Sequence, residues 1–169
     1  MTQQIPDFFD LTYLSKGSTI QQSGYRAIVS SGVMDLLGEF TPVVVGTLPL
    51  DLFTYMSDID IICYFTDLEK FKSALRYPAR KELGGIDSVV ASFERDRFQF
   101  EIVGQPIPVT QQVAYRHLVT EWNILAAKGK DFHTKVMELK RKGIKTEPAF
   151  AQLLGLPGDP YQALLSYRV

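Results

Sequence analysis

The sequence predicts a single α+β domain in which a short mixed sheet is covered by helices. Strand-like segments gather between residues 43 and 103, helical spacings follow from residue 110, and no repeat or low-complexity linker interrupts the chain. The length of 169 residues, 46% of them hydrophobic, suits one domain with a buried core. We expect an α/β core over residues 1–109 and a helical part over residues 110–169.

Two helical segments are expected before the sheet. Residues 5–14 are rich in aromatic and aliphatic side chains and should dock on the core as a short helical arm. Ser18 is suited to cap a helix over residues 19–37, because its hydroxyl can accept a hydrogen bond from a free amide of the first turn. Gly38 should end this helix.

The centre of the chain predicts two neighbouring strands. The run from Val43 to Val45 is unbroken and β-branched, which is typical of a strand buried on both faces. After a break at Gly46, Asp58 and Asp60 alternate with isoleucines in a second strand. Because side chains alternate across a strand, both carboxylates should lie on one face.

The other elements are assigned from caps, turns and periodicity. We expect a capping box at Thr66–Glu69 that opens a helix to about residue 75, a loop or irregular crossing segment over residues 80–86, a β-hairpin of residues 87–93 and 97–103, an extended connector over residues 105–108, and helices over residues 110–127, 130–142 and 146–154.

Composition disfavours several classes of function. With 18 basic and 19 acidic residues the formal charge is −1, whereas proteins that track a nucleic-acid backbone usually carry a basic excess, so a nucleic-acid polymer is disfavoured as a partner. No signal peptide and no apolar run near the ~20 residues of a membrane span is found, so we expect a cytoplasmic protein without membrane association. The lone Cys63 excludes an intrachain disulfide and suits a reducing compartment.

The two aspartates raise an electrostatic question. At an effective dielectric near 20, like charges about 4 Å apart repel by on the order of 4 kcal/mol. A bound cation or a retained proton would relieve this repulsion, and Mg²⁺ prefers carboxylate and phosphate oxygens. We therefore predict a site for Mg²⁺ or Mn²⁺ at Asp58 and Asp60. The alternative is an exposed edge strand with a polar face, which the apolar run Ile61–Cys63 argues against.

Gly46 and Thr47, followed after a short loop by Ser57-Asp58-Ile59-Asp60, resemble the Gly-Ser/Thr and Asp-x-Asp signature of the nucleotidyltransferase superfamily typified by DNA polymerase β. In addition, residues 113–118 and 145–150 look like segments of an uncharacterised bacterial family that is assigned to this superfamily as a domain of unknown function. This second resemblance covers most of the chain and brings no known substrate.

The resemblance implies a minimal nucleotidyltransferase fold and a set of site residues. Asp58 and Asp60 would hold two divalent metals together with a third carboxylate from a neighbouring strand. Glu101 suits that role because Phe98, Phe100 and Ile102 occupy the opposite face of its strand, although an ordinary solvated glutamate is the alternative. The small loop with Gly46 and Thr47, together with Ser57, would bind the triphosphate of a nucleotide.

Two further groups carry open alternatives. His117 and Glu121 lie one helical turn apart and could bind metal or act as a base with its orienting carboxylate, but a structural hydrogen bond between them is favoured. The basic run of residues 140–145 could hold the leaving pyrophosphate, with Lys145 as the first residue to test. Cations at a helix C-terminus are also favoured by the helix dipole without any ligand.

The sequence thus leads to two hypotheses. The first is a metal-dependent nucleotidyltransferase, with a nucleoside triphosphate as substrate and an acceptor that the residues do not specify. The second is a non-catalytic module of the same fold that binds nucleotide or metal or acts as a regulatory, toxin–antitoxin-like partner. The base, the acceptor and the oligomeric state stay open.

Overall fold

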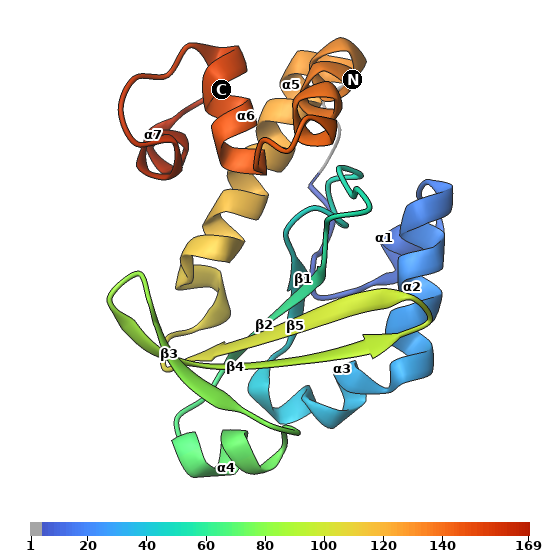
Figure 1. Cartoon of the computed structure of the whole chain (residues 1–169), viewed down its shortest axis with the longest axis vertical. Coiled ribbons are helices and arrows are strands. Elements are labelled where there is room, and N and C mark those ends of the chain that lie inside the picture. The colour runs from blue at the N-terminus through green and yellow to red at the C-terminus, as the bar shows by residue number, and fades with distance from the viewer. Residues whose placement is uncertain (1–4) are drawn as a thin grey trace.

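A five-stranded mixed sheet forms the centre of the molecule in the computed structural model, which describes residues 5–169. Its spatial order is β1-β2-β5-β4-β3 (Figure 1). The strands are β1 (Val43–Val45), β2 (Ile59–Tyr64), β3 (Ala79–Leu83), β4 (Ile86–Arg95) and β5 (Phe98–Gln105). Only β2 and β5 run parallel, whereas the other neighbouring pairs are antiparallel.

Seven α-helices within the described residues surround this sheet. They are α1 (Thr12–Ser15), α2 (Thr19–Ser31), α3 (Val33–Leu36), α4 (Leu68–Ser73), α5 (Val113–Arg141), α6 (Thr146–Leu154) and α7 (Pro160–Ser166). Two short 3-10 helices, η1 (Gly38–Phe40) and η2 (Val109–Gln111), complete the set. The predicted α+β class, with a mixed sheet and a helical C-terminal part, is confirmed.

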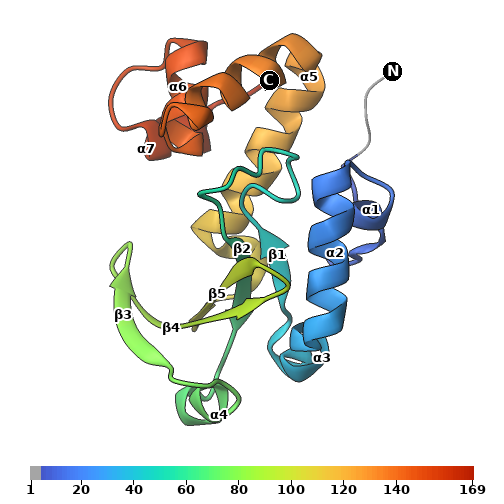
Figure 2. The same cartoon turned by 45° about the vertical axis from the view of Figure 1, so that its right-hand side comes forward.

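The sheet separates two hydrophobic cores, because β2 alternates its side chains between the two faces. Ile59, Ile61 and Cys63 pack into the first core with buried residues of α2 and α3. Ile62 packs into the second core with buried residues of α5, α6 and α7. Figure 2 shows the resulting arrangement, with the sheet between α2 and α5. Side chains at even-numbered positions of β2 therefore face the C-terminal helices.

The first long helix is shorter than expected. Ser18 does cap α2, in a reciprocal capping box with Gln21. The prediction that one helix runs to residue 37 is wrong, because Gly32 adopts a left-handed conformation (φ 68°) and ends α2 at Ser31. α3 then begins at Val33, and η1 follows at the predicted stop, Gly38.

One strand and two helices correct the remaining assignments. The segment 80–86, predicted to be a loop or crossing segment, forms β3 and the turn to β4, with Leu83 opposite Ile86. The capping box at Thr66 is wrong by one residue, because Asp67 is the N-cap of α4 and accepts from the amide of Lys70. α7 was not predicted at all, although Asp159 caps it and Pro160 opens it.

The hairpin and the C-terminal helices agree with expectation. β4 and β5 form the predicted antiparallel pair. The predicted helices 110–127 and 130–142 form the two parts of α5, which meet at Gly129, whose φ of 75° and ψ of −169° are not helical. α6 has the predicted bounds. Among residues 5–169, none of the helices combines the length and the apolar character that a membrane span requires.

Candidate active site

The candidate site begins where β1 ends. Gly46 follows Val45 with a positive φ of 73°, which favours glycine. A β-carbon at this position would overlap the Oδ2 atom of Asp60. The β1–β2 pairing explains the proximity, because Val45 is the register partner of Asp60. Gly46 therefore lets the backbone turn away from the sheet while the Asp60 carboxylate lies against it.

Glu101 lies beside Asp60 in the sheet. The two residues are register partners in the parallel pair of β2 and β5, so their side chains leave the same face. The opposite face of β5 carries Phe100 and Ile102, which are buried in the first core. The structure thus brings together Asp60 and Glu101, as the alternation of the two strands predicts.

Asp58 stands just outside the sheet. The prediction that Asp58 belongs to the second strand is wrong, because β2 begins at Ile59 and Asp58 is the exposed last residue of the preceding loop. Its charge nevertheless acts on Asp60. Ser57 organises the same loop, since its hydroxyl accepts a hydrogen bond of 2.9 Å from the amide of Thr54.

Two adjoining cavities meet at this point. The first, which we call the lysine-bearing cavity, has a volume of about 230 Å³ and is lined in part by Thr47, Ser57, Asp58, Lys140 and Lys145. The second, which we call the acidic cavity, has a volume of about 570 Å³ and is lined in part by Glu101, His117 and Tyr161. Gly46, Asp60, Glu121 and Glu147 line both cavities.

The electrostatics of Asp60 follow from this crowding. Burial, and then the charges of Glu101, Asp58 and Glu147, raise the pKa of Asp60 from 3.8 to about 7. The charge of Lys140 opposes this shift. The site therefore holds more negative charge than it can stabilise without a proton or a cation.

The predicted phosphate-binding residues gather in the lysine-bearing cavity. The Oγ1 atom of Thr47 is buried without a hydrogen-bond partner among residues 5–169, so its donor and acceptor capacity is unused there. Lys145 is the exposed N-cap of α6 and lies in the same lining as Ser57. The structure thus groups Gly46, Thr47, Ser57 and Lys145 with Asp58 and Asp60.

Lys140 is the inward-facing member of the basic run. Its ammonium donates a hydrogen bond of 2.7 Å to the hydroxyl of Thr146. Burial lowers the pKa of Lys140, and the charges of Glu147, Glu121 and Asp60 oppose that shift. Arg141 and Lys142, by contrast, are exposed. The sequence singled out Lys145, whereas in the structure the charge of Lys140 acts on Asp60 and Glu121.

Glu121 is a buried acid with an unsatisfied oxygen. Its side chain is 3% exposed, and its Oε1 atom has no hydrogen-bond partner among residues 5–169. Burial, and then the charge of Glu147, raise the pKa of Glu121 well above its usual range, against the effect of Lys140. A buried carboxyl without a hydrogen-bond partner is unusual in a protein interior and indicates a functional site.

The favoured hydrogen bond between His117 and Glu121 is wrong. The Nε2 atom of His117 donates a hydrogen bond of 2.9 Å to the backbone carbonyl of Tyr161 in α7. Its Nδ1 atom lies 3.8 Å from Glu147 Oε1, which forms an ion pair when the imidazole is protonated. The partners of His117 come from other helices and not from its own. α6 and α7 pack against α5, and they supply Glu147 and Tyr161 in place of Glu121.

Glu147 is the functional candidate that sequence reasoning missed. An acidic residue in the first turn of a helix has an ordinary explanation in the helix dipole, so the sequence gives no separate signal for it. Only the packing of α6 against α5 brings its charge to bear on Asp60, Glu121 and Lys140.

The carboxylates suit a hard divalent cation in chemistry and charge. Within residues 5–169, no three His, Cys, Asp or Glu side chains are close enough together to form a complete metal site by themselves. Asp60 and Glu101 supply adjacent oxygen ligands, and the raised pKa of Asp60 is the effect that a bound cation would reverse. Mg²⁺ commonly takes only one or two protein carboxylates and completes its shell with water and phosphate.

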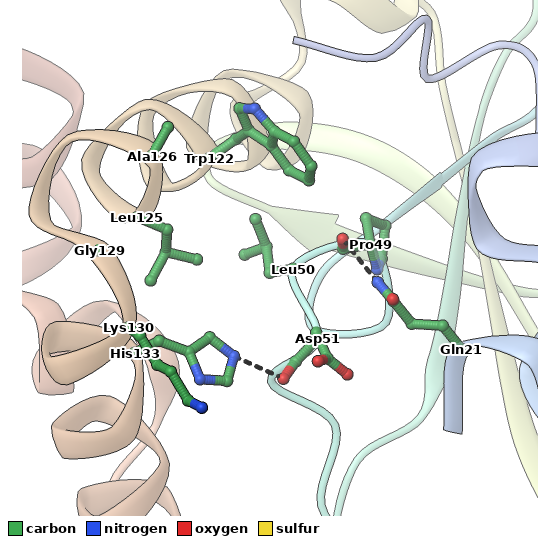
Figure 3. A pocket seen from close by; sticks show the side chains of 10 residues that line it. All are labelled: Gln21, Pro49, Leu50, Asp51, Trp122, Leu125, Ala126, Gly129, Lys130 and His133. Carbon is green, nitrogen blue, oxygen red and sulfur yellow. Dashed lines mark hydrogen bonds between the residues drawn. The ribbon is translucent and has the colours of Figure 1, made fainter. Parts of the chain in front are cut away.

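A separate cavity of about 460 Å³ is lined by residues of α5, by Gln21 of α2 and by the turn after β1 (Figure 3). Its lining joins α5 to the turn after β1. The Nε2 atom of His133 donates a hydrogen bond of 2.9 Å to the carbonyl of Asp51, and the Gln21 amide donates to the carbonyls of Leu48 and Pro49. These contacts from α5 and α2 fix the turn from two sides.

The fold is shared with a nucleotidyltransferase. A solved structure titled "Structural Basis for the Activity of a Cytoplasmic RNA Terminal U-transferase" matches with a TM-score of 0.50 and 15% sequence identity, over 85% of this chain and 50% of that one. At this identity the likeness concerns the fold alone. The chain spans about half the length of that enzyme. No curated protein matches the chain.

A family described as "Domain of unknown function (DUF4269)" matches residues 26–167, and the chain belongs to this family. The match includes every lining residue of the lysine-bearing cavity and of the acidic cavity.

Proposed function

We propose that the protein is a metal-dependent nucleotidyltransferase, which transfers a nucleoside monophosphate from a nucleoside triphosphate to an acceptor hydroxyl. The observation that carries this proposal is the position of the adjacent carboxylates Asp60 and Glu101 beside the tight turn at Gly46. The nucleotidyltransferase fold of the chain supports it.

The triphosphate belongs in the lysine-bearing cavity. The hydroxyl of Thr47 has no hydrogen-bond partner among the residues that the structure describes, and the ammonium groups of Lys140 and Lys145 are the cations of the lining. Cations of this kind stabilise the negative charge that accumulates on pyrophosphate as it leaves. The Gly46 backbone permits close approach of a phosphate because it carries no side chain.

Asp60 and Glu101, the adjacent pair on the sheet, would hold Mg²⁺ or Mn²⁺, and the charge of Asp58 acts on the same position. When bound, these cations supply activation of the attacking hydroxyl and neutralisation of the leaving pyrophosphate. The protein's own residues orient the reactants, since Asp60 lies on the wall between the two cavities. In the reaction the acceptor oxygen bonds to the α-phosphorus, the bond from that phosphorus to the pyrophosphate oxygen breaks, and the hydroxyl proton passes to solvent.

Nucleotide binding and turnover test this proposal separately. The full chain is titrated with each nucleoside triphosphate in the presence of Mg²⁺ or Mn²⁺, and binding is measured by calorimetry. Pyrophosphate release is then measured in the presence of pooled small-molecule acceptors. We expect binding of at least one triphosphate, and metal-dependent release that Asp60→Asn abolishes.

Lys140→Ala and Lys142→Ala form a matched pair. Both remove a lysine ammonium from the same turn, but only Lys140 lines the cavity and Lys142 is exposed. We expect weaker triphosphate binding for Lys140→Ala alone. Failure of every triphosphate to bind with metal would overturn the proposal, whereas binding without release in the presence of an acceptor that also binds would identify a non-catalytic nucleotide-binding module.

A further inference from the structure

We propose that the acidic cavity binds a small organic cation, an amine-bearing compound with a hydroxyl group and an apolar portion, as the acceptor of the transferred nucleotide. This inference rests on the proposed function and names the substrate class of the same site.

The charge of the two cavities differs. Four carboxylic acids, Asp60, Glu101, Glu121 and Glu147, line the acidic cavity. Among the described residues no lysine or arginine belongs to its lining, whereas Lys140 and Lys145 line the neighbouring cavity. An anionic acceptor would be repelled by this wall, and a cation would be attracted.

Two of the four acids are not needed to hold metal. Asp60 and Glu101 form the adjacent pair on the sheet, while Glu121 and Glu147 come from α5 and α6. Glu121 is 3% exposed, and its Oε1 atom has no hydrogen-bond partner within the described part of the chain. An ammonium group would supply the missing donors, and a hydrogen bond between two charged groups is stronger than one between neutral groups.

The rest of the cavity suits an apolar portion of the ligand. Val113 and Tyr161 are 46% and 37% exposed, and both lie in the lining. Leu83 and Ile86, which flank the β3–β4 turn, contribute from the sheet side, while α7 contributes Tyr161 from the helical side. Figure 1 shows this turn and α7 on the same side of the molecule. The volume of about 570 Å³ falls within the roughly 300–1,000 Å³ of small-molecule sites.

In this arrangement the ammonium anchors the acceptor and does not react. The acceptor's hydroxyl oxygen forms the new bond to the α-phosphorus of the triphosphate, pyrophosphate leaves with the electrons of the broken bond, and the hydroxyl proton is released to solvent. Asp60 lies between the cavities, so the hydroxyl and the α-phosphate can meet beside it.

Three probes of equal size and different charge test the inference. The full chain is titrated with 2-amino-1-phenylethanol, 1-phenyl-1,2-ethanediol and mandelate. All three contain a phenyl ring and a neighbouring hydroxyl group, and they differ in carrying an ammonium, a second hydroxyl or a carboxylate beside it. Binding is followed by the chemical shifts of backbone amides, without nucleotide. We expect the ammonium probe to bind at least about tenfold more tightly than the other two, with shifts at Val113, Glu121 and Glu147.

Variants of the two helix-borne acids show where the ammonium probe binds. Glu121→Gln and Glu147→Gln should each reduce the affinity for the ammonium probe by about tenfold or more, while Glu138→Gln, an exposed change on the same helix, should leave it unchanged. Thermal unfolding of each variant confirms that it is folded, and Glu147→Gln serves if Glu121→Gln fails to fold.

The outcomes separate this inference from the proposed function. Equal affinity for the three probes, no binding of the ammonium probe, or its displacement by ATP with Mg²⁺ would overturn the cation-binding acceptor site. Failure of all triphosphates to bind would overturn the transferase proposal instead, and the probe titration would still decide whether the cavity selects cations.

Discussion

The Cα atom of Gly46 lies so close to the Asp60 carboxylate that no β-carbon can be accommodated between them. Gly46 also has a positive φ of 73°. The two constraints have different origins, since one comes from the turn after β1 and the other from the side chain of the neighbouring strand. Together they couple the loop of the candidate phosphate site to the carboxylate of the candidate metal site.

The Gly46→Ala variant should be less stable by about 2–4 kcal/mol, because the backbone strain of a positive φ and the overlap with Asp60 add. Gly32→Ala is the matched control. Gly32 has a similar φ of 68°, but a β-carbon there meets nothing within 4 Å. Urea unfolding of both variants measures the difference, and equal losses of stability would contradict the close packing of Gly46 on Asp60.

Asp60 should make the metal-free protein less stable as pH rises. Its pKa is about 7 in the folded protein and near 3.8 in the unfolded chain, so between these values the folded state keeps a proton that the unfolded state has lost. Stability therefore falls as pH rises from about 4 to 7, by a few kcal/mol for this group, and the loss is complete above pH 7. Glu121, whose pKa is also raised, acts in the same direction.

Urea unfolding at several pH values between 4 and 8 tests this dependence. Asp60→Asn should flatten the decline and be more stable than the unsubstituted protein above pH 7. Asp35→Asn, an exposed change on α3, provides the control and should leave the slope unaltered. A decline of the same steepness in Asp60→Asn and the unsubstituted protein would show that Asp60 is not responsible.

Divalent metal should stabilise the protein above pH 7, where the Asp60 carboxylate is ionised. At a Mg²⁺ or Mn²⁺ concentration about 100-fold above the dissociation constant, the expected gain is about 2.7 kcal/mol. Removal of the metal with a chelator should reverse it. The midpoint of thermal unfolding, measured against NaCl at equal ionic strength, separates specific binding from screening. No gain in the unsubstituted protein, or the same gain in Asp60→Asn and Glu101→Gln, would argue against the metal site.

His133 should act as a positioning residue for the loop that carries Thr47. Its donated hydrogen bond to the Asp51 carbonyl joins the second part of α5 to the turn after β1 (Figure 3). His133→Ala should lower stability by about 1 kcal/mol and weaken triphosphate binding. The comparison is Thr134→Ala, which removes only a bond to the Lys130 carbonyl within the same helix. Calorimetric titration with a triphosphate should distinguish the two variants, and an unchanged affinity in His133→Ala would refute the positioning role.

The central strands could be predicted because their signals are local. The β-branched run at Val43, the alternation around Asp60 and the phenylalanines that alternate with Glu101 are properties of adjacent residues, and the sheet keeps each of them. The same local signals missed β3, whose residues are mostly exposed and carry no apolar alternation. α7 was missed although its cap is a strong local signal.

Local patterns in the chain specify the α+β class, the face on which Asp60 and Glu101 lie, and the turn at Gly46, because periodicity and backbone preference act over a few residues. Packing between distant segments brings Glu147 and Lys140 into this site, joins His117 to Tyr161 and not to Glu121, and places the β3–β4 hairpin and α7 at the acidic cavity. Those contacts join segments far apart in the chain, so they depend on how the helices pack on the sheet. No spacing within one segment specifies that packing.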